Sequence, residues 1–377
     1  MAAAAATSPG SAVRVIEVVH AAGRYEVIVA PGAVATLPAR VEALLGPRRL
    51  AVVTDTTVAP LLRGWLGGGG WPGTVLTLPP GEAHKTRESW ARLTDELLAR
   101  GFGRDSAIVA VGGGVVGDVA GFVAATFARG IPVVQVPTTL LAMLDASVGG
   151  KTGVDTPHGK NLVGAFHQPA LVVADPRTLA SLGAREYRAG LAEAVKHGLV
   201  ADAAYLDWIA AHADALLARD EAALVALVAR SVEIKAEVVT ADEREGGRRA
   251  VLNAGHTVAH ALEHASGYAL LHGEAVALGL VAESAIAERL GVAQAGTAAR
   301  VRAVLQRLGL PVAAPGTADA AVTLAAMRLD KKNRAAAVRC ALPRAVGSME
   351  EAAGHWTVPV DDTTLAAGLG AIGVGAA

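Results

Sequence analysis

Four histidines fall within 17 residues, and a glutamate in an earlier segment adds a carboxylate to them. His256, His260 and His264 recur every four residues, so a helix would place them on one face. Two imidazoles and one carboxylate, with a fourth position open to substrate, form a catalytic zinc site. Spacing alone favours His256 and His260 with Glu193, and His272 is a further donor. The alternative is that these histidines are ordinary surface or core residues of helices.

A run of glycines indicates a nucleotide site. A buried-strand pattern over residues 107–111 runs into Gly112-Gly113-Gly114, and a helical pattern follows the sequence GGGVVGD. Glycines let the backbone approach a pyrophosphate, and the helix N-terminus supplies N–H donors. The spacing is GGGxxG rather than the common GxGxxG, so a plain strand-to-helix turn is the alternative. The polar segment 81–86, GEAHKT, is a second turn, or a helix start with Thr86 as its cap.

A third group of polar residues lies in the stretch 137–169. Asp145 interrupts the apolar run LLAMLDASV, where a carboxylate is costly to bury unless it is paired or hydrogen-bonded. Lys151 and Lys160 each follow a glycine, and Asn161 comes next. Lysines on glycine-rich loops suit a phosphate or a polyhydroxylated anion. A solvated loop with surface lysines is the alternative.

Two kinds of element must position these side chains. In the first half, strand patterns alternate with helical ones, which predicts a parallel, doubly wound, Rossmann-like sheet. The second half is helical from about residue 178, with no strand pattern before 338–342. The predicted strands are 14–19, 25–29, 49–54, 107–111 and 133–136. The predicted helices are 89–99, 115–128, 191–200, 203–217, 221–239, 257–265, 274–290 and 298–308.

The predicted fold class is therefore α/β, with a mainly helical C-terminal domain that binds the metal. A chain of 377 residues exceeds the usual limit for one hydrophobic core, which also favours two domains. We predict a flexible tail over residues 1–12, a nucleotide-binding α/β domain over 13–177, and a helical metal- and substrate-binding domain over 178–377.

Composition narrows the classes of function. The formal net charge is −1, so no overall field would hold nucleic acid or an anionic membrane. Cys340 is the single cysteine, which excludes an internal disulfide and a cysteine-based zinc site. The first 12 residues lack the basic and apolar regions of a signal peptide, and apolar runs stay too short for a membrane span. These features favour a cytoplasmic enzyme.

The chain resembles the 3-dehydroquinate synthase family over about residues 14–345. Several blocks carry the resemblance in the family's order, which makes a chance match very improbable. They are GEAHKT, GGGVVGDVAGFVAATFARG, VPTTLLAMLDASVGGKTGVD, GKNLVGAFHQP, GLAEAVKHGL, EIKAEVV with DERE, LNAGHT, LHGEAVALG and DKKNR.

The resemblance implies a metal set and a cofactor set. Zinc, or cobalt in its place, would be bound by Glu193, His256 and His272, which moves His260 from the metal to the substrate phosphate. NAD+ would be bound by residues of six segments. They are Asp55, Gly81, Glu82, Lys85, Thr86, Gly113, Gly114, Val115, Val116, Gly117, Asp118, Thr138, Thr139, Lys151, Lys160, Thr178, Leu179, Ala180 and Ser181.

The resemblance also implies a substrate set. Lys235 and Arg249 would pair with a carboxylate, and Asn253 and His260 would contact a phosphate. Arg129 would reach the site of a neighbouring subunit, which implies a homodimer. The remaining expected residues are Asp145 and Lys196 at the hydroxyls, Lys151, Lys160 and Asn161 between cofactor and substrate, and Lys331, or else Lys332, at the phosphate.

The family's reaction converts 3-deoxy-D-arabino-heptulosonate 7-phosphate into 3-dehydroquinate and phosphate, in the shikimate pathway that leads to aromatic amino acids. It implies a transient oxidation by NAD+ at a zinc-held hydroxyl, elimination of phosphate, return of the hydride, and an internal aldol closure. The separate basic clusters suit a phosphorylated sugar acid held through several steps.

Three alternatives remain open from the sequence. Another sugar-phosphate cyclase, acting on sedoheptulose 7-phosphate, would have no substrate carboxylate for Lys235 and Arg249. A metal-dependent polyol dehydrogenase would release NADH and would not need paired carboxylate and phosphate clusters. A non-catalytic NAD-binding protein would have lost a zinc ligand or Lys151, and every such position is occupied.

Overall fold

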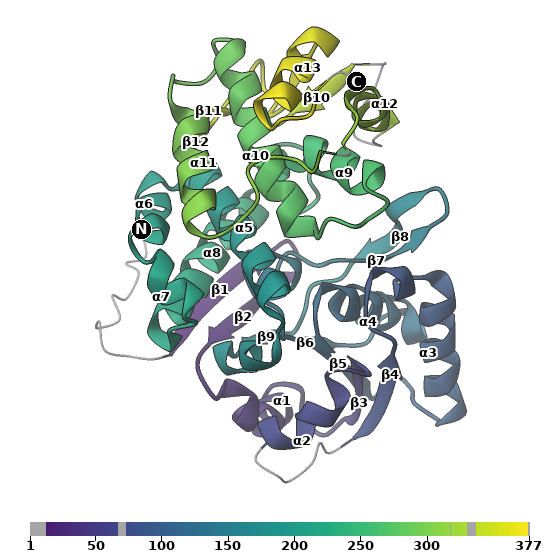
Figure 1. Cartoon of the computed structure of the whole chain (residues 1–377). Coiled ribbons are helices and arrows are strands. Elements are labelled where there is room, and N and C mark those ends of the chain that lie inside the picture. Colours follow the sequence, from purple (N-terminus) through teal and green to yellow (C-terminus); the bar gives the residue numbers. More distant parts are fainter. Residues whose placement is uncertain (1–12, 67–72, 317, 330–336, 376–377) are drawn as a thin grey trace. The chain divides into compact units, whose positions relative to one another are not determined.

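The computed structural model describes residues 13–66, 73–316, 318–329 and 337–375 (Figure 1). The predicted tail and Lys331 therefore lie outside the described residues. The chain forms two compact units. The first comprises residues 1–182 with 220–233, and the second comprises residues 183–219 with 234–377.

A seven-stranded sheet forms the centre of the first unit, in the order β1-β2-β9-β6-β5-β3-β4. The β1 and β2 strands pair antiparallel, and the other pairs are parallel. The order turns back between β3 and β5, as in doubly wound folds that bind ligands at this point. The strands are β1 (Arg14–His20), β2 (Gly23–Val29), β3 (Arg49–Asp55), β4 (Thr74–Leu78), β5 (Ser106–Gly112), β6 (Val133–Pro137) and β9 (Leu171–Ala174).

The inner strands of this sheet are buried on both faces. Their alternate residues point to opposite sides, and each set packs in its own apolar cluster. In β5, Ile108 packs in one apolar cluster with Leu93 and Val119, whereas Val109 packs in another with Leu37. Figure 1 shows the corresponding helices around the sheet. They are α1 (Leu37–Leu45), α2 (Leu62–Trp65), α3 (Arg87–Ala99) and α4 (Gly114–Thr126). Burial on two sides explains the continuous apolar runs in the sequence.

The second unit is mainly helical. Its strands form two short antiparallel pairs, β10 with β13 and β11 with β12. The helices are α5 (Ala184–Ala201), α6 (Ala203–Ala211), α7 (Ala213–Leu217), α9 (His256–Ala265), α10 (His272–Arg289), α11 (Thr297–Arg307), α12 (Ala320–Leu329) and α13 (Asp362–Ala371). The strands are β10 (Val338–Cys340), β11 (Pro343–Ala345), β12 (Ser348–Met349) and β13 (Val358–Val360). Helix α8 (Glu221–Ala241) begins in the first unit and ends in the second. The predicted fold class is confirmed.

One segment differs from its prediction as a glycine-rich loop. The stretch after residue 150 forms an antiparallel hairpin of β7 (Lys151–Thr156) and β8 (Gly159–Phe166). The reason is close packing of the backbone rather than looseness. A Cβ atom at Gly164 would lie 2.1 Å from the Thr152 carbonyl oxygen, so only glycine allows this pairing.

One smaller difference concerns a helix. The predicted helix over 203–217 is divided into α6 and α7 at His212. Among the described residues, no helix combines the length and apolar character needed to cross a membrane.

Candidate functional site

Three side chains from three helices meet in the second unit. Glu193 lies in α5, His256 is the first residue of α9, and His272 is the first residue of α10. The Glu193 Oε1 atom lies 3.7 Å from His256 Nε2 and 3.5 Å from His272 Nε2. One ligand atom of each residue lies within 4.8 Å of the others. This set of one carboxylate and two imidazoles fits a divalent metal such as zinc with a coordination position left for substrate.

Close helix packing brings these residues together. A Cβ atom at Gly273 would lie 1.9 Å from the Ala189 carbonyl oxygen, one turn before Glu193 on α5. A Cβ atom at Gly279 would lie 1.9 Å from the Gly255 carbonyl oxygen, directly before His256. Glycine at these two positions of α10 therefore lets that helix approach both ligand-bearing elements.

Spacing alone favoured His256 and His260 as the metal-binding pair, but the structure places His272, not His260, in the group with Glu193 and His256. The His260 ring centre lies 5.6 Å from that of His256 and 6.4 Å from that of His272, but the group around Glu193 contains His272. Spacing along one helix identifies neighbours on that helix. It cannot reveal a donor that a second helix brings in.

A lysine provides the positive charge beside this carboxylate. Lys196 Nζ lies 2.5 Å from Glu193 Oε2, and each side chain is only 1% exposed. Burial lowers the pKa of His272, but hydrogen bonds and charge from Glu193 and Glu263 outweigh burial and raise that pKa to about 9. Two carboxylates therefore lie against the His272 ring, one at each of its nitrogen atoms.

The loop after α8 carries Arg249, a predicted substrate residue, and Asp242, which holds the loop in place. Asp242 accepts hydrogen bonds from the backbone N–H groups of Gly246 (3.0 Å), Gly247 (2.7 Å) and Arg249 (2.9 Å). The Arg249 guanidinium is buried and donates to the Glu243 carbonyl oxygen. This loop therefore holds the buried Arg249 side chain in the same unit as Glu193, His256 and His272.

Two more predicted substrate residues belong to the second unit. Asn253 Nδ2 donates to Glu245 Oε1 at 2.7 Å. Lys235, on α8, is buried with 5% of its surface exposed. Both side chains are therefore held within the fold of the second unit.

Predicted cofactor residues in the first unit share one edge of the sheet. Asp55 ends β3, Gly113 follows β5, Thr138 follows β6, and Thr178 follows β9. These strands are parallel and adjacent, so their carboxyl ends lie together. Ligands of doubly wound sheets bind at this edge. The Thr178–Ser181 stretch belongs to a 3-10 helix that Asp175 caps.

Helix α4 presents its N-terminus at the same edge. It begins at Gly114 after Gly113, and among the described residues no side chain caps it. Its first N–H groups are therefore available to an anion such as a pyrophosphate. The residues Val115, Val116 and Gly117 form its first turn.

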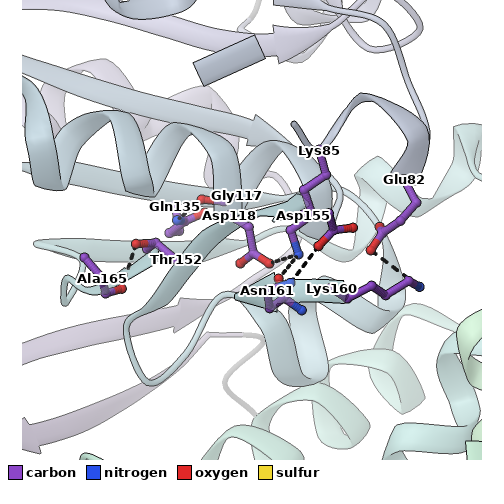
Figure 2. Close-up of polar contacts among 10 residues, drawn as sticks. All are labelled: Glu82, Lys85, Gly117, Asp118, Gln135, Thr152, Asp155, Lys160, Asn161 and Ala165. Carbon is purple, nitrogen blue, oxygen red and sulfur yellow. Dashed lines mark hydrogen bonds and ion pairs between the residues drawn. The ribbon is translucent and has the colours of Figure 1, made fainter. Parts of the chain in front are cut away.

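Figure 2 shows a polar cluster around Lys85. The Lys85 Nζ atom lies 2.5 Å from Asp118 Oδ2 and donates to Asn161 Oδ1 at 2.6 Å. Burial lowers the pKa of Lys85, but the charges of Asp118, Glu82 and Asp155 outweigh it and raise the pKa above its usual value. Lys85 therefore stays charged in the fold.

The hairpin joins this cluster through its backbone. Asp155 Oδ1 accepts from the Asn161 N–H at 2.8 Å, and Asn161 has a φ of +55°. The Asp155 N–H donates to the Lys85 carbonyl oxygen at 2.7 Å. Lys160 Nζ lies 3.6 Å from Glu82 Oε1. The structure thus brings together predicted residues from three separate segments.

The remaining predicted residues occupy distinct places in the first unit. Asp145 lies in a π-helical turn, Ala142–Ala146, and is half-buried. Lys151 begins β7 and is exposed. Thr86 caps α3, as its helix-start interpretation predicts, by accepting from the Ser89 N–H at 3.2 Å. Arg129 is exposed in a turn with a φ of +68°.

Two carboxylates beside the predicted residues were missed by sequence reasoning. Glu263 lies against His272, and Asp242 holds the Arg249 loop. The DERE sequence contains no signal that Asp242 caps its own loop. Glu263 contacts His272 from a different helix, so spacing along the sequence offers no signal for it either.

Two family models cover most of the chain. The model for the N-terminal part of 3-dehydroquinate synthase matches residues 75–189, and the model for the C-terminal part matches residues 190–333. A 3-dehydroquinate synthase of Symbiobacterium thermophilum is 50% identical over 326 residues, which cover 85% of this chain and 91% of the relative.

Solved structures show the same fold with cofactors. A 2-epi-5-epi-valiolone synthase of Streptomyces hygroscopicus, with NAD+ and Zn²⁺ bound, has a TM-score of 0.82 at 32% identity, covering 93% of this chain and 96% of its own. A 2-deoxy-scyllo-inosose synthase complexed with carbaglucose-6-phosphate, NAD+ and Co²⁺ has a TM-score of 0.85 at 25% identity, covering 93% and 98%. The two family models match residues 75–333, and half of the 326 aligned residues are identical in a named relative, so this chain belongs to the 3-dehydroquinate synthase family.

Proposed function

We propose that this enzyme is a 3-dehydroquinate synthase, which converts 3-deoxy-D-arabino-heptulosonate 7-phosphate into 3-dehydroquinate and phosphate. The observation that carries the proposal is the group of Glu193, His256 and His272 beside Lys196, in a chain that belongs to this family. Its 50% identity to a named synthase, against 32% to a valiolone-type cyclase, favours this substrate over the alternatives.

Two cofactors belong to the proposal. The donor set of Glu193, His256 and His272 fits zinc or cobalt, and the edge of the first unit's sheet fits NAD+. When bound, the metal would polarise a substrate hydroxyl, and NAD+ would accept a hydride and return it within one turnover. Related cyclases with NAD+ and Zn²⁺ or Co²⁺ bound support both assignments.

The second unit's residues would orient the substrate. Lys196 contributes a buried positive charge beside the hydroxyl that is oxidised. Lys235 and Arg249, both buried, would bind the carboxylate. Asn253, His260 and a lysine of the 331–332 pair would hold the phosphate.

The first unit's residues would hold the dinucleotide. The N–H groups at the start of α4 would bind its pyrophosphate. Lys85 is fixed by Asp118 and Asn161 and would present a permanent positive charge to this anion. Glu82, Lys160, Lys151, Asp55 and the threonines at the ends of β6 and β9 complete the proposed contacts, and Asp145 would contact substrate hydroxyls.

Three broader features complete the proposal. The enzyme would act in the cytoplasm, in the shikimate pathway towards chorismate and the aromatic amino acids. It would act as a homodimer in which Arg129 enters the neighbouring subunit's site. The exposed side chain of Arg129 and the positive φ angles of Ala128 and Arg129 are consistent with a residue presented outward. Nucleic acid and membrane are not expected partners.

Phosphate release tests this proposal. Purified protein, loaded with zinc and given a catalytic amount of NAD+, is assayed with 3-deoxy-D-arabino-heptulosonate 7-phosphate and with sedoheptulose 7-phosphate in parallel. The proposal expects phosphate from the first substrate alone and no net NADH. Release from the second substrate alone would assign the chain to another cyclase, and net NADH would assign it to a dehydrogenase.

A further inference from the structure

Glu263 is a buried carboxylate that has no role in the proposed chemistry. It lies in α9, in the same helix as His256, and is 3% exposed. A carboxylate at this depth is costly unless it serves a specific partner. One group that it contacts is the ring of His272, at the start of α10.

The His272 ring lies between two carboxylates. Its Nδ1 atom is 3.5 Å from Glu263 Oε1, and its Nε2 atom is 3.5 Å from Glu193 Oε1. A neutral imidazole carries its proton on one nitrogen and a lone pair on the other. In the neutral ring, an acceptor at Nδ1 retains the proton there and leaves the Nε2 lone pair available to a metal ion that Glu193 also binds.

His256 offers an internal comparison, because its ring is arranged the same way by a different group. Its Nδ1 atom lies 3.1 Å from the Ala254 carbonyl oxygen, and its Nε2 atom also faces Glu193 Oε1. Both imidazoles thus present Nε2 to the same carboxylate oxygen. One is oriented by the backbone and the other by a side chain that a substitution can remove.

We propose that Glu263 is the positioning residue for the metal ligand His272: it holds the Nδ1–H and so fixes the tautomer and the ring plane in which Nε2 binds the ion. This inference rests on the metal site of the proposed function. Carboxylates that accept from the outer nitrogen of a ligating histidine raise its basicity, and their removal typically weakens metal binding about 10- to 100-fold.

The test measures metal affinity rather than activity. The full chain is stripped of metal and titrated with Zn²⁺ against a competing chelator, and with Co²⁺ to record its visible absorption spectrum. Glu263→Ala removes the acceptor and the charge. Glu263→Gln keeps an oxygen acceptor of similar size. The control, Glu288→Gln, removes a half-buried carboxylate of α10 that accepts from the Ala298 N–H and touches no ligand.

The proposal expects Zn²⁺ binding about 10- to 100-fold weaker for Glu263→Ala, about threefold to tenfold weaker for Glu263→Gln, and unchanged for the control. It also expects an altered Co²⁺ spectrum for both Glu263 variants. Affinity of Glu263→Ala within threefold of the parent would overturn it, as would an equal loss in the control. Should Glu263→Ala fail to fold, Glu263→Gln decides: binding as tight as the parent's would overturn the proposal.

These outcomes separate the inference from the proposed function. The unsubstituted protein could bind zinc tightly, lose affinity on substitution of Glu263, and yet release no phosphate from the sugar acid. This result would support the positioning role of Glu263 and contradict the synthase assignment. If the unsubstituted protein releases phosphate and the Glu263 variants bind zinc as tightly as it does, the synthase assignment is supported and the role of Glu263 is contradicted.

Discussion

Both units contain a buried lysine 2.5 Å from a carboxylate, but the two pairs are built differently. Lys196 and Glu193 lie three residues apart on α5, and both are 1% exposed. Lys85 and Asp118 come from separate segments, and Asp118 is 20% exposed. The first pair follows from helix spacing, whereas the second depends on the whole fold of its unit. Because water screens the Lys196–Glu193 pair less, breaking that pair should cost more stability than breaking the Lys85–Asp118 pair.

The largest effect is expected from removing a metal ligand. His256→Ala takes one imidazole from the group and should abolish tight zinc binding. A bound metal supplies several kcal/mol of charge stabilisation, so kcat/KM should fall about a thousandfold or more. Metal content by mass spectrometry and phosphate release are measured on the same sample. A variant that keeps both zinc and activity would remove His256 from the centre.

Of the two lysine–carboxylate pairs, the Lys196–Glu193 pair should lose more stability when its lysine is replaced, as in Lys196→Met. It leaves the Glu193 charge buried without its nearest cation, a situation that costs about 3 kcal/mol or more. Bound metal supplies a second positive partner for Glu193, so the loss of unfolding free energy should be smaller in zinc-loaded protein. Denaturant unfolding with and without zinc measures this difference. Equal losses in both forms would argue against a metal on Glu193.

Lys85→Met should have a smaller effect, because Asp118 is partly exposed to water. It removes hydrogen bonds to Asp118 and Asn161, and NAD+ binding should weaken about tenfold. Arg92→Met is the control, since it breaks an exposed pair with Glu96 that is worth little. NAD+ affinity is measured by calorimetry. Equal affinities in both variants would contradict a role for Lys85 at the dinucleotide.

The smallest effect concerns Asp242, whose loop carries Arg249. Burial raises the pKa of Asp242, but the N–H groups of Arg249, Gly246 and Gly247 outweigh it and lower that pKa. Its stabilising effect is therefore present above the unfolded pKa of about 4 and lost as the pH falls through the lower folded value. Asp242→Asn should lower Tm slightly at pH 7 and have less effect near pH 3. A difference that is independent of pH would contradict this reading.

The parts of the site that the sequence reveals are those with local spacing. Glu193 and Lys196 share a helix face, Thr86 caps the helix that follows it, and the strand patterns predict a sheet buried on both faces. Each of these depends on residues at most a few positions apart. Periodicity and capping preferences therefore identify them without a structure.

The parts that the sequence hides are those that only tertiary packing creates. His272 reaches Glu193 because Gly273 lets α10 approach α5, and periodicity within α9 favoured His260 instead. The glycines of residues 149–164 looked like a loop, but Gly164 serves close strand pairing. The contact of Glu263 with His272 joins two helices and has no local signature.

The most direct test of the central claim is an anomalous-difference map at the zinc edge, from crystals of the zinc-loaded protein. We predict one strong peak at about 2.0–2.2 Å from a Glu193 oxygen, His256 Nε2 and His272 Nε2. A peak bound instead by His260 or His264, or no peak beside Glu193, would contradict the metal centre and the function that rests on it.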